Sequence, residues 1–150
     1  MRSVSIRTGV VLSKESELIK RAVFPTKLGL AAPLGKGTQY MPWIHIDDLC
    51  QIYIKAIEDK TMTGAYNAVA PEDATNAQFM RKVAKVLNKP MFLPPVPGFI
   101  FKLVLGETSQ VILGGSRVSS KKIQDAGYKF TYKTLSRALK KILLKGREKQ

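Results

Sequence analysis

Apolar and polar positions alternate with a period of two in several short stretches of the chain. Over residues 3–12, Val4, Ile6, Val10 and Leu12 line one face and are rich in β-branched types, which predicts a strand. Val11 adds an apolar residue on the other face, so we expect both faces of this strand to be covered. Further strands are predicted at 40–46, 64–70, 91–93 and 128–132.

Between these strands the apolar residues recur at helical spacing. The stripe Leu49, Ile52, Tyr53, Ala56 and Ile57 predicts an amphipathic helix. A second predicted helix is capped by Ser13 and closed by Pro25, and a third begins with a Thr75–Gln78 capping box and is ended by Asn88 and Pro90. Three more helices are predicted: one over 99–105, one of about two turns ending at Gly127, and one from Thr134 to Leu144. We expect a hairpin tip at 35–37 and a short segment around Val111.

Helices and strands alternate throughout, so the predicted fold class is α/β. A chain of 150 residues can bury about 68–70% of the surface of its unfolded form, enough for a hydrophobic core. Cys50 is the single cysteine, which excludes an internal disulfide and fits a reducing compartment, the cytoplasm. The apolar stretch at 91–105 is broken by prolines and Lys102 and is shorter than a membrane span, so we expect no membrane association.

The net charge of +14 is concentrated near the C-terminus. Between Arg117 and Gln150 eleven Lys or Arg residues face only Asp125 and Glu148, a local net charge of +9. Two interpretations stay open: a surface that binds nucleic acid or an acidic partner, and an ordinary solvated helix face. No aromatic ladder, zinc-ligand spacing or helix-turn-helix pattern accompanies the charge, which favours the solvated face.

The stretch YMPWIHIDDL, residues 40–49, holds the single tryptophan, the single histidine and an acidic pair. Asp48 stands where a predicted strand gives way to a helix, so we predict that it caps this helix, with Asp47 adding charge at the same end. His45 lies between two isoleucines and should point to the opposite side of the strand. With no second ligand at metal-binding spacing, a structural role for His45 is favoured over a catalytic base or a metal ligand.

The familiar catalytic motifs are missing from the sequence. It contains no G-x-G-x-x-G, P-loop or G-x-S-x-G motif, and no tyrosine is followed by a lysine four positions later. Residue patterns alone therefore predict no complete active site.

Several segments, taken together and in order, resemble one protein family. They are RTGVVLS, KLGLAAPLGKGTQYMPWIHIDDL, GAYNAVAPEDATNAQF, KPMFLPPVP and GGSRVSSKKIQDAGYKFTY. The chain is similar to the C-terminal half of NAD(P)-dependent epimerase-like proteins, a branch of the extended short-chain dehydrogenase/reductases with a C-terminal domain of unknown function. The resemblance runs from about Arg7 to Leu143.

The resemblance implies a domain organisation. Residues 1–70 would supply the last strands of a Rossmann-like NAD(P)-binding sheet, residues 71–145 a small substrate-side α/β subdomain, and residues 146–150 a basic tail. In the family, the glycine-rich dinucleotide loop and the Tyr-x-x-x-Lys pair belong to an N-terminal half. We therefore expect no catalytic residue and no metal ligand in this chain, which alone would be inactive and bind NAD(P) poorly.

The resemblance also implies candidate site residues. Thr8, Gly9 and Val10 match the segment that passes beside the nicotinamide ring, and Gly9 would let the backbone approach it, although an ordinary strand end is equally consistent. Met41 stands where nucleotide-sugar members place a diphosphate-binding arginine. A thioether cannot supply that charged fork. Met41 and Trp43 would instead form an apolar substrate wall, unless both are simply core residues.

The preferred interpretation is thus the C-terminal portion of an epimerase/dehydratase-like oxidoreductase whose substrate is unknown. Its partner would be a second copy of the chain or a separately encoded N-terminal half. The alternative is a basic interaction module, although nucleic acid is not the favoured partner.

Overall fold

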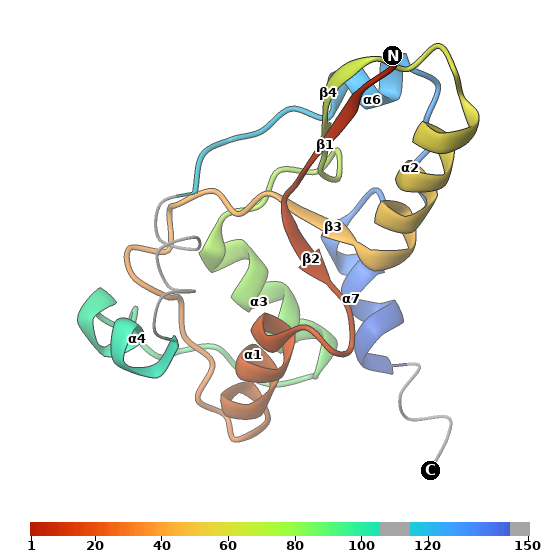
Figure 1. The fold of residues 1–150 in the computed structure, drawn as a ribbon. Coiled ribbons are helices and arrows are strands. Elements are labelled where there is room, and N and C mark those ends of the chain that lie inside the picture. The colour runs from red at the N-terminus through yellow and green to blue at the C-terminus, as the bar shows by residue number, and fades with distance from the viewer. Residues whose placement is uncertain (106–114, 145–150) are drawn as a thin grey trace.

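The computed structural model describes residues 1–105 and 115–144, and Figure 1 shows their arrangement. In chain order the elements are β1 (Val4–Thr8), β2 (Val10–Leu12), α1 (Glu17–Lys27), β3 (Trp43–His45), α2 (Ile46–Glu58), β4 (Gly64–Ala68), α3 (Asn76–Val86), α4 (Gly98–Leu105), α6 (Lys121–Asp125) and α7 (Leu135–Leu144). Strands and helices alternate over most of this order, which confirms the predicted α/β class.

The strands form two parallel pairs rather than one sheet. β1 pairs with β4 in the register Val4 to Gly64, and β2 pairs with β3 in the register Val10 to Trp43. The predicted strand over 3–12 is therefore two strands, because the chain changes partner at Gly9. Among the described residues, β1 and β2 each have a strand on one side only.

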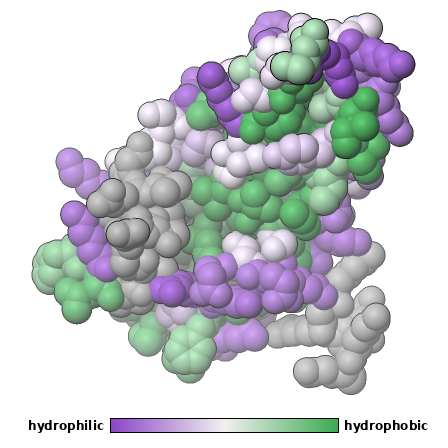
Figure 2. Space-filling view, viewed as in Figure 1, coloured by the Kyte–Doolittle hydropathy of each residue, from purple (hydrophilic) through white to green (hydrophobic). Residues whose placement is uncertain are grey.

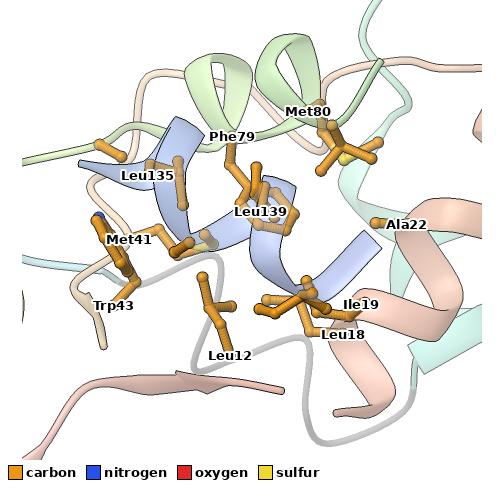
Figure 3. Packing of buried hydrophobic residues seen from close by; sticks show 14 of the residues in the cluster. Leu12, Leu18, Ile19, Ala22, Met41, Trp43, Phe79, Met80, Leu135 and Leu139 are labelled. Carbon is orange, nitrogen blue, oxygen red and sulfur yellow. The ribbon is translucent and has the colours of Figure 1, made fainter. Parts of the chain in front are cut away.

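Two hydrophobic clusters hold these elements together. The larger one joins α1, α3 and α7 to β2 and β3, and Figure 3 shows how Leu12, Trp43, Phe79 and Leu139 converge in it. The second cluster packs α2 and Ile123 against β1, β3 and β4. Each cluster draws residues from both sides of position 70, so the two expected units share their cores, and the boundary there stays a prediction.

Several local predictions are confirmed because short-range chemistry decides them. Thr75 and Gln78 form the capping box: each side chain accepts a hydrogen bond from the other residue's backbone N–H. Asn88 follows α3 with a φ of 55°, a left-handed conformation that asparagine tolerates, and the helix ends as predicted. Thr134 accepts from the N–H of Arg137 at 3.4 Å at the start of α7.

Other predictions are wrong. Helix α1 begins after Ser16 rather than Ser13, and Pro25 lies inside it instead of closing it. Residues 35–37 do turn, but the flanking residues do not pair with one another: Leu34 pairs with Val96, and Tyr40 with Thr75. Residues 91–93 and 128–132 are not strands. The segment predicted around Val111 lies outside the described residues.

The predicted covering of both faces of the first strand is only partly correct. Val4 and Ile6 pack against the second cluster, whereas Ser5 and Arg7 are exposed on the other side of β1. Val11 of β2 packs against the second cluster and Leu12 is buried in the first, so β2, unlike β1, contacts both cores. Two polar residues therefore keep one face of β1 in solvent.

Candidate functional site

A cavity of about 360 Å³ opens where β1 ends and β2 begins. The three residues predicted to contact a cofactor, Thr8, Gly9 and Val10, all line it, and so does Met41. Its other lining residues include the apolar Pro42, Val69 and Val118 and the polar Arg7, Asn67 and Ser116. The structure thus brings the candidate cofactor segment and one candidate substrate residue together, while their ligand contacts stay predictions.

Gly9 has a packing reason to be glycine. Its N–H donates to the carbonyl of Ala68 at 3.3 Å, and the next N–H, of Val10, donates to the carbonyl of Pro42 at 2.8 Å. These bonds draw the backbone so close that a Cβ on Gly9 would lie 2.7 Å from the Pro42 oxygen and 2.9 Å from Val69 Cγ1. The missing side chain therefore makes room for the protein's own backbone, which is where the chain passes from one strand pair to the other.

The two predicted wall residues lie in different surroundings. Met41 is almost fully buried in the larger cluster but still reaches the cavity. Trp43 is not among the residues that line it. Its ring lies in the larger cluster, and its indole N–H donates to the carbonyl of Glu72 at 3.0 Å. The structure therefore places Trp43 in the core, the second of the two roles left open for it.

The acidic corner at the start of α2 corrects the predicted cap. His45, not Asp48, is the N-cap: its Nδ1 accepts a hydrogen bond from the N–H of Asp47 at 3.1 Å. The imidazole is buried and stacks on the ring of Tyr132 with 3.9 Å between centroids. Burial lowers the pKa of His45, against the opposing effect of Asp47 and Asp48. A buried, neutral imidazole acting as an acceptor is a structural group, as expected.

Asp48 is a tertiary anchor. Its carboxylate is buried and accepts three hydrogen bonds, from the Tyr128 hydroxyl at 2.7 Å and from the N–H groups of Thr131 and Tyr132 at 2.8 and 2.9 Å. Burial, and then the bond to Asp48, raise the pKa of Tyr128 far above its ordinary value. The backbone at 128–132, predicted as a strand, thus finds its partner in a side chain instead of a sheet.

A metal centre is not indicated at this corner or elsewhere in the described residues. Within residues 1–105 and 115–144, no group of three or more His, Cys, Asp or Glu side chains is placed to hold an ion. Over the same ranges, no helix is long and apolar enough to cross a bilayer.

Comparison with known proteins identifies the chain's relatives. Residues 96–142 match the family described as Domain of unknown function (DUF1731). The mouse protein named Epimerase family protein SDR39U1 is 37% identical over 143 residues, which cover 95% of this chain and 48% of that protein. Epimerase family protein YfhF of Bacillus subtilis is 34% identical, with 95% and 46% covered. Over almost its whole length the chain is thus similar to about half of each of these epimerase family proteins.

The solved structures agree with this relationship. The human epimerase family protein SDR39U1, determined with NADPH, superposes with a TM-score of 0.86 at 36% identity, covering 95% of this chain and 48% of that one. A UDP-glucose 4-epimerase from Thermus thermophilus superposes with a TM-score of 0.67 at 18% identity, which supports the fold alone. The chain thus corresponds to the C-terminal part of an extended short-chain dehydrogenase/reductase, with a Rossmann-like fold, and spans about half the length of the curated relatives it matches.

Sequence reasoning missed one residue that organises this fold. Glu72 binds at three points: its backbone carbonyl accepts from Trp43, one carboxylate oxygen pairs with Lys82 at 2.7 Å, and the other accepts from the N–H of Leu135 at the start of α7. A carboxylate at a helix N-terminus is a common stabilising arrangement. Because Leu135 is 63 residues away along the chain, no local pattern could have indicated it.

The basic C-terminal region is partly engaged within the molecule. Arg117 pairs with Asp73 at 2.6 Å, and Lys121 pairs with Asp125 at 2.7 Å. Lys122 donates to the carbonyl of Ala65 at 2.7 Å and lies over the ring of Tyr66. In these contacts Arg117, Lys121 and Lys122 stabilise the fold. None of these contacts favours a nucleic-acid surface.

Proposed function

We propose that this chain is the C-terminal portion of an NAD(P)-dependent epimerase/dehydratase-like oxidoreductase and forms one wall of its cofactor and substrate site. The observation that carries the proposal is the cavity in which Thr8, Gly9 and Val10 meet Met41. The human relative determined with NADPH supports a nicotinamide cofactor. When bound, this cofactor supplies or accepts a hydride, and the residues of this chain bind and orient what lies beside its ring.

The cavity suits the nicotinamide end of such a cofactor better than the phosphates. Val10, Pro42 and Val69 give an apolar surface for a ring, and Thr8 and Asn67 add hydrogen-bonding groups to the lining. Pyrophosphate is normally held by backbone N–H groups at a helix N-terminus. None of the residues that line the cavity lies in a helix, so the phosphate-binding part must come from elsewhere.

The proposed substrate is a molecule with an uncharged apolar part near Met41. Because a methionine stands where nucleotide-sugar members of the family place an arginine, this position offers no fork for a diphosphate. Arg7 is the one charged side chain among the lining residues.

The proposed location is a reducing compartment, such as the cytoplasm. The single cysteine, Cys50, carries an exposed free thiol, which fits such a compartment.

The proposed partner is an N-terminal half that carries the glycine-rich loop and the tyrosine–lysine pair. It would add a strand along the side of β1 and β2 that has no strand neighbour among the described residues. Figure 2 shows an apolar area over the part of the face where these two strands run in Figure 1. A second copy of the chain is the alternative occupant of this edge.

The cofactor proposal can be tested by calorimetric titration of the 150-residue chain. We expect no saturable heat for NADPH or NADH at micromolar concentration, because phosphate-binding amides are missing from the cavity lining. A micromolar dissociation constant for either dinucleotide contradicts a chain that supplies only one wall.

Weak contact with the ring itself can be tested by amide NMR with nicotinamide mononucleotide at millimolar concentration. We expect shifts at Thr8, Val10 and Val69. Thr8→Trp should abolish them by filling the cavity, whereas Ser5→Trp, at another exposed position of β1 outside the cavity, should leave them unchanged. Shifts elsewhere, or equal effects of both variants, contradict the assigned wall.

The docking edge can be tested by sedimentation equilibrium. We expect the chain at tens of micromolar to form a dimer, and the dimer to give way to a heterodimer when an N-terminal half is added. A monomer that does not bind the added N-terminal half contradicts the proposed edge.

A further inference from the structure

The end of α1 and the outer side of α4 expose large apolar side chains. Phe24 and Leu28, four residues apart, are 70% and 62% exposed, and Leu30 follows them. On α4, Phe99 and Leu103 are 68% and 86% exposed. In Figure 1, α4 lies at the lower left and α1 at the bottom of the molecule, and Figure 2 shows apolar areas in both of these regions. We refer to Phe24, Leu28, Leu30, Phe99, Ile100 and Leu103 as the α1–α4 face.

The structure connects both parts of this face. The segment after α1 and the segment before α4 pair at Leu34 and Val96, where the Val96 N–H donates to the Pro33 carbonyl at 2.9 Å and the Val96 carbonyl accepts from Gly35 at 2.9 Å. An apolar groove of about 180 Å³ runs between them, and both Leu30 and Ile100 line it. The exposed residues therefore belong to one surface that extends over two helices.

The charged residues within the two segments of the α1–α4 face, residues 24–30 and 99–103, are both lysines. The acidic residue of α1, Glu17, lies at the other end of the helix, where it pairs with Lys20 and Arg21. Lys27 is at the end of α1, and Lys102 lies between Phe99 and Leu103 on α4; both lysines are exposed. A group of six exposed apolar side chains marks an interaction site, and the two lysines beside it favour a partner with negative charge.

We propose that the α1–α4 face docks on the surface of an anionic lipid bilayer. Apolar side chains of the face enter the boundary between headgroups and acyl chains, and the lysines contact lipid phosphates and carboxylates. With eight residues α4 is far too short to span, so the proposed contact is at the bilayer surface and departs from the expectation of no membrane association, which rested on the lack of a span. A second copy fits less well, because a two-fold contact would bring the same lysines of both copies together in an apolar interface.

Vesicle sedimentation tests this proposal with the 150-residue chain. We expect binding to vesicles of phosphatidylcholine containing about 30% phosphatidylserine and much weaker binding to phosphatidylcholine alone. Lys27→Glu with Lys102→Glu should lower binding to the anionic vesicles. Binding that does not depend on the anionic lipid overturns the proposal.

A matched pair of double variants separates this face from general stickiness. Phe99→Ser with Leu103→Ser should reduce partitioning at least about tenfold, because the inserted apolar surface is lost. Ile54→Ser with Ile57→Ser alters two exposed apolar residues of another helix, α2, and should leave partitioning within about twofold. Equal losses in both pairs overturn the proposal. So does a dimer in solution that dissociates in the α4 variant while the chain ignores vesicles.

Discussion

Replacing Asp48 by asparagine is the sharpest test of how this fold is held together. If Asp48 merely capped α2, asparagine would serve as well as aspartate, because both are good N-cap residues. In the structure one oxygen accepts from Tyr128 and Thr131, and the other accepts from the N–H of Tyr132. An asparagine can keep its oxygen toward the first two donors, but its amide N–H₂ then faces the third.

The expected magnitude follows from these contacts. Losing a hydrogen bond to a charged acceptor and leaving the buried Tyr132 N–H without a partner should cost about 2–4 kcal/mol of unfolding free energy. Asp48→Ala removes all three bonds and should cost more, about 4 kcal/mol or above. Asp47→Asn is the control one position earlier, at an exposed side chain, and should cost less than about 1 kcal/mol.

Urea unfolding measures all three variants. Trp43 is the single tryptophan and is buried, so its fluorescence reports on the larger cluster, while far-UV circular dichroism follows the helices. If Asp48→Asn unfolds within about 0.5 kcal/mol of the parent, the three hydrogen bonds do not stabilise the fold and the anchor described above is wrong.

Two further predictions concern the neighbouring residues. Gly9→Ala should lower the unfolding free energy by about 1–3 kcal/mol, because its Cβ would press on Pro42 and Val69. Gly98→Ala, with open space around the added Cβ, should be neutral or stabilising. Thermal unfolding compares the two variants, and equal shifts of their melting temperatures would contradict the packing reason. Because the pKa of His45 is lowered on folding, the unfolded state binds the proton more tightly, so stability should fall as pH drops below 6.5 towards the folded pKa. His45→Asn keeps a capping acceptor without titrating and should flatten this dependence in urea titrations between pH 5 and 8, and an unchanged slope would assign it to another group.

The parts of the fold that could be predicted are those set by neighbours in sequence. The Thr75–Gln78 capping box, the end of α3 at Asn88 and the helix after Thr134 all depend on side chains within four residues of the backbone they serve. Local chemistry decides such features. The α/β class followed from the same periodic patterns.

The parts that could not be predicted depend on distant partners. The backbone at 128–132 has the composition of a strand, yet it pairs with the carboxylate of Asp48 instead of another strand. At the candidate site, the resemblance identified Thr8–Val10 and Met41, but only packing distinguishes Met41, which reaches the cavity, from Trp43, which does not.

The anchor at Asp48 also sets an order of events during synthesis. Its three donors lie 80 to 84 residues further along the chain, and the β1–β4 pairing likewise joins Val4 to Gly64. On a ribosome, α2 would emerge with an aspartate whose partners do not yet exist, and the buried carboxylate could not leave water until residues 128–132 had followed. Nascent chains arrested before that point should remain open to proteases around α2. The completion of this fold is thus timed by the emergence of residues 128–132.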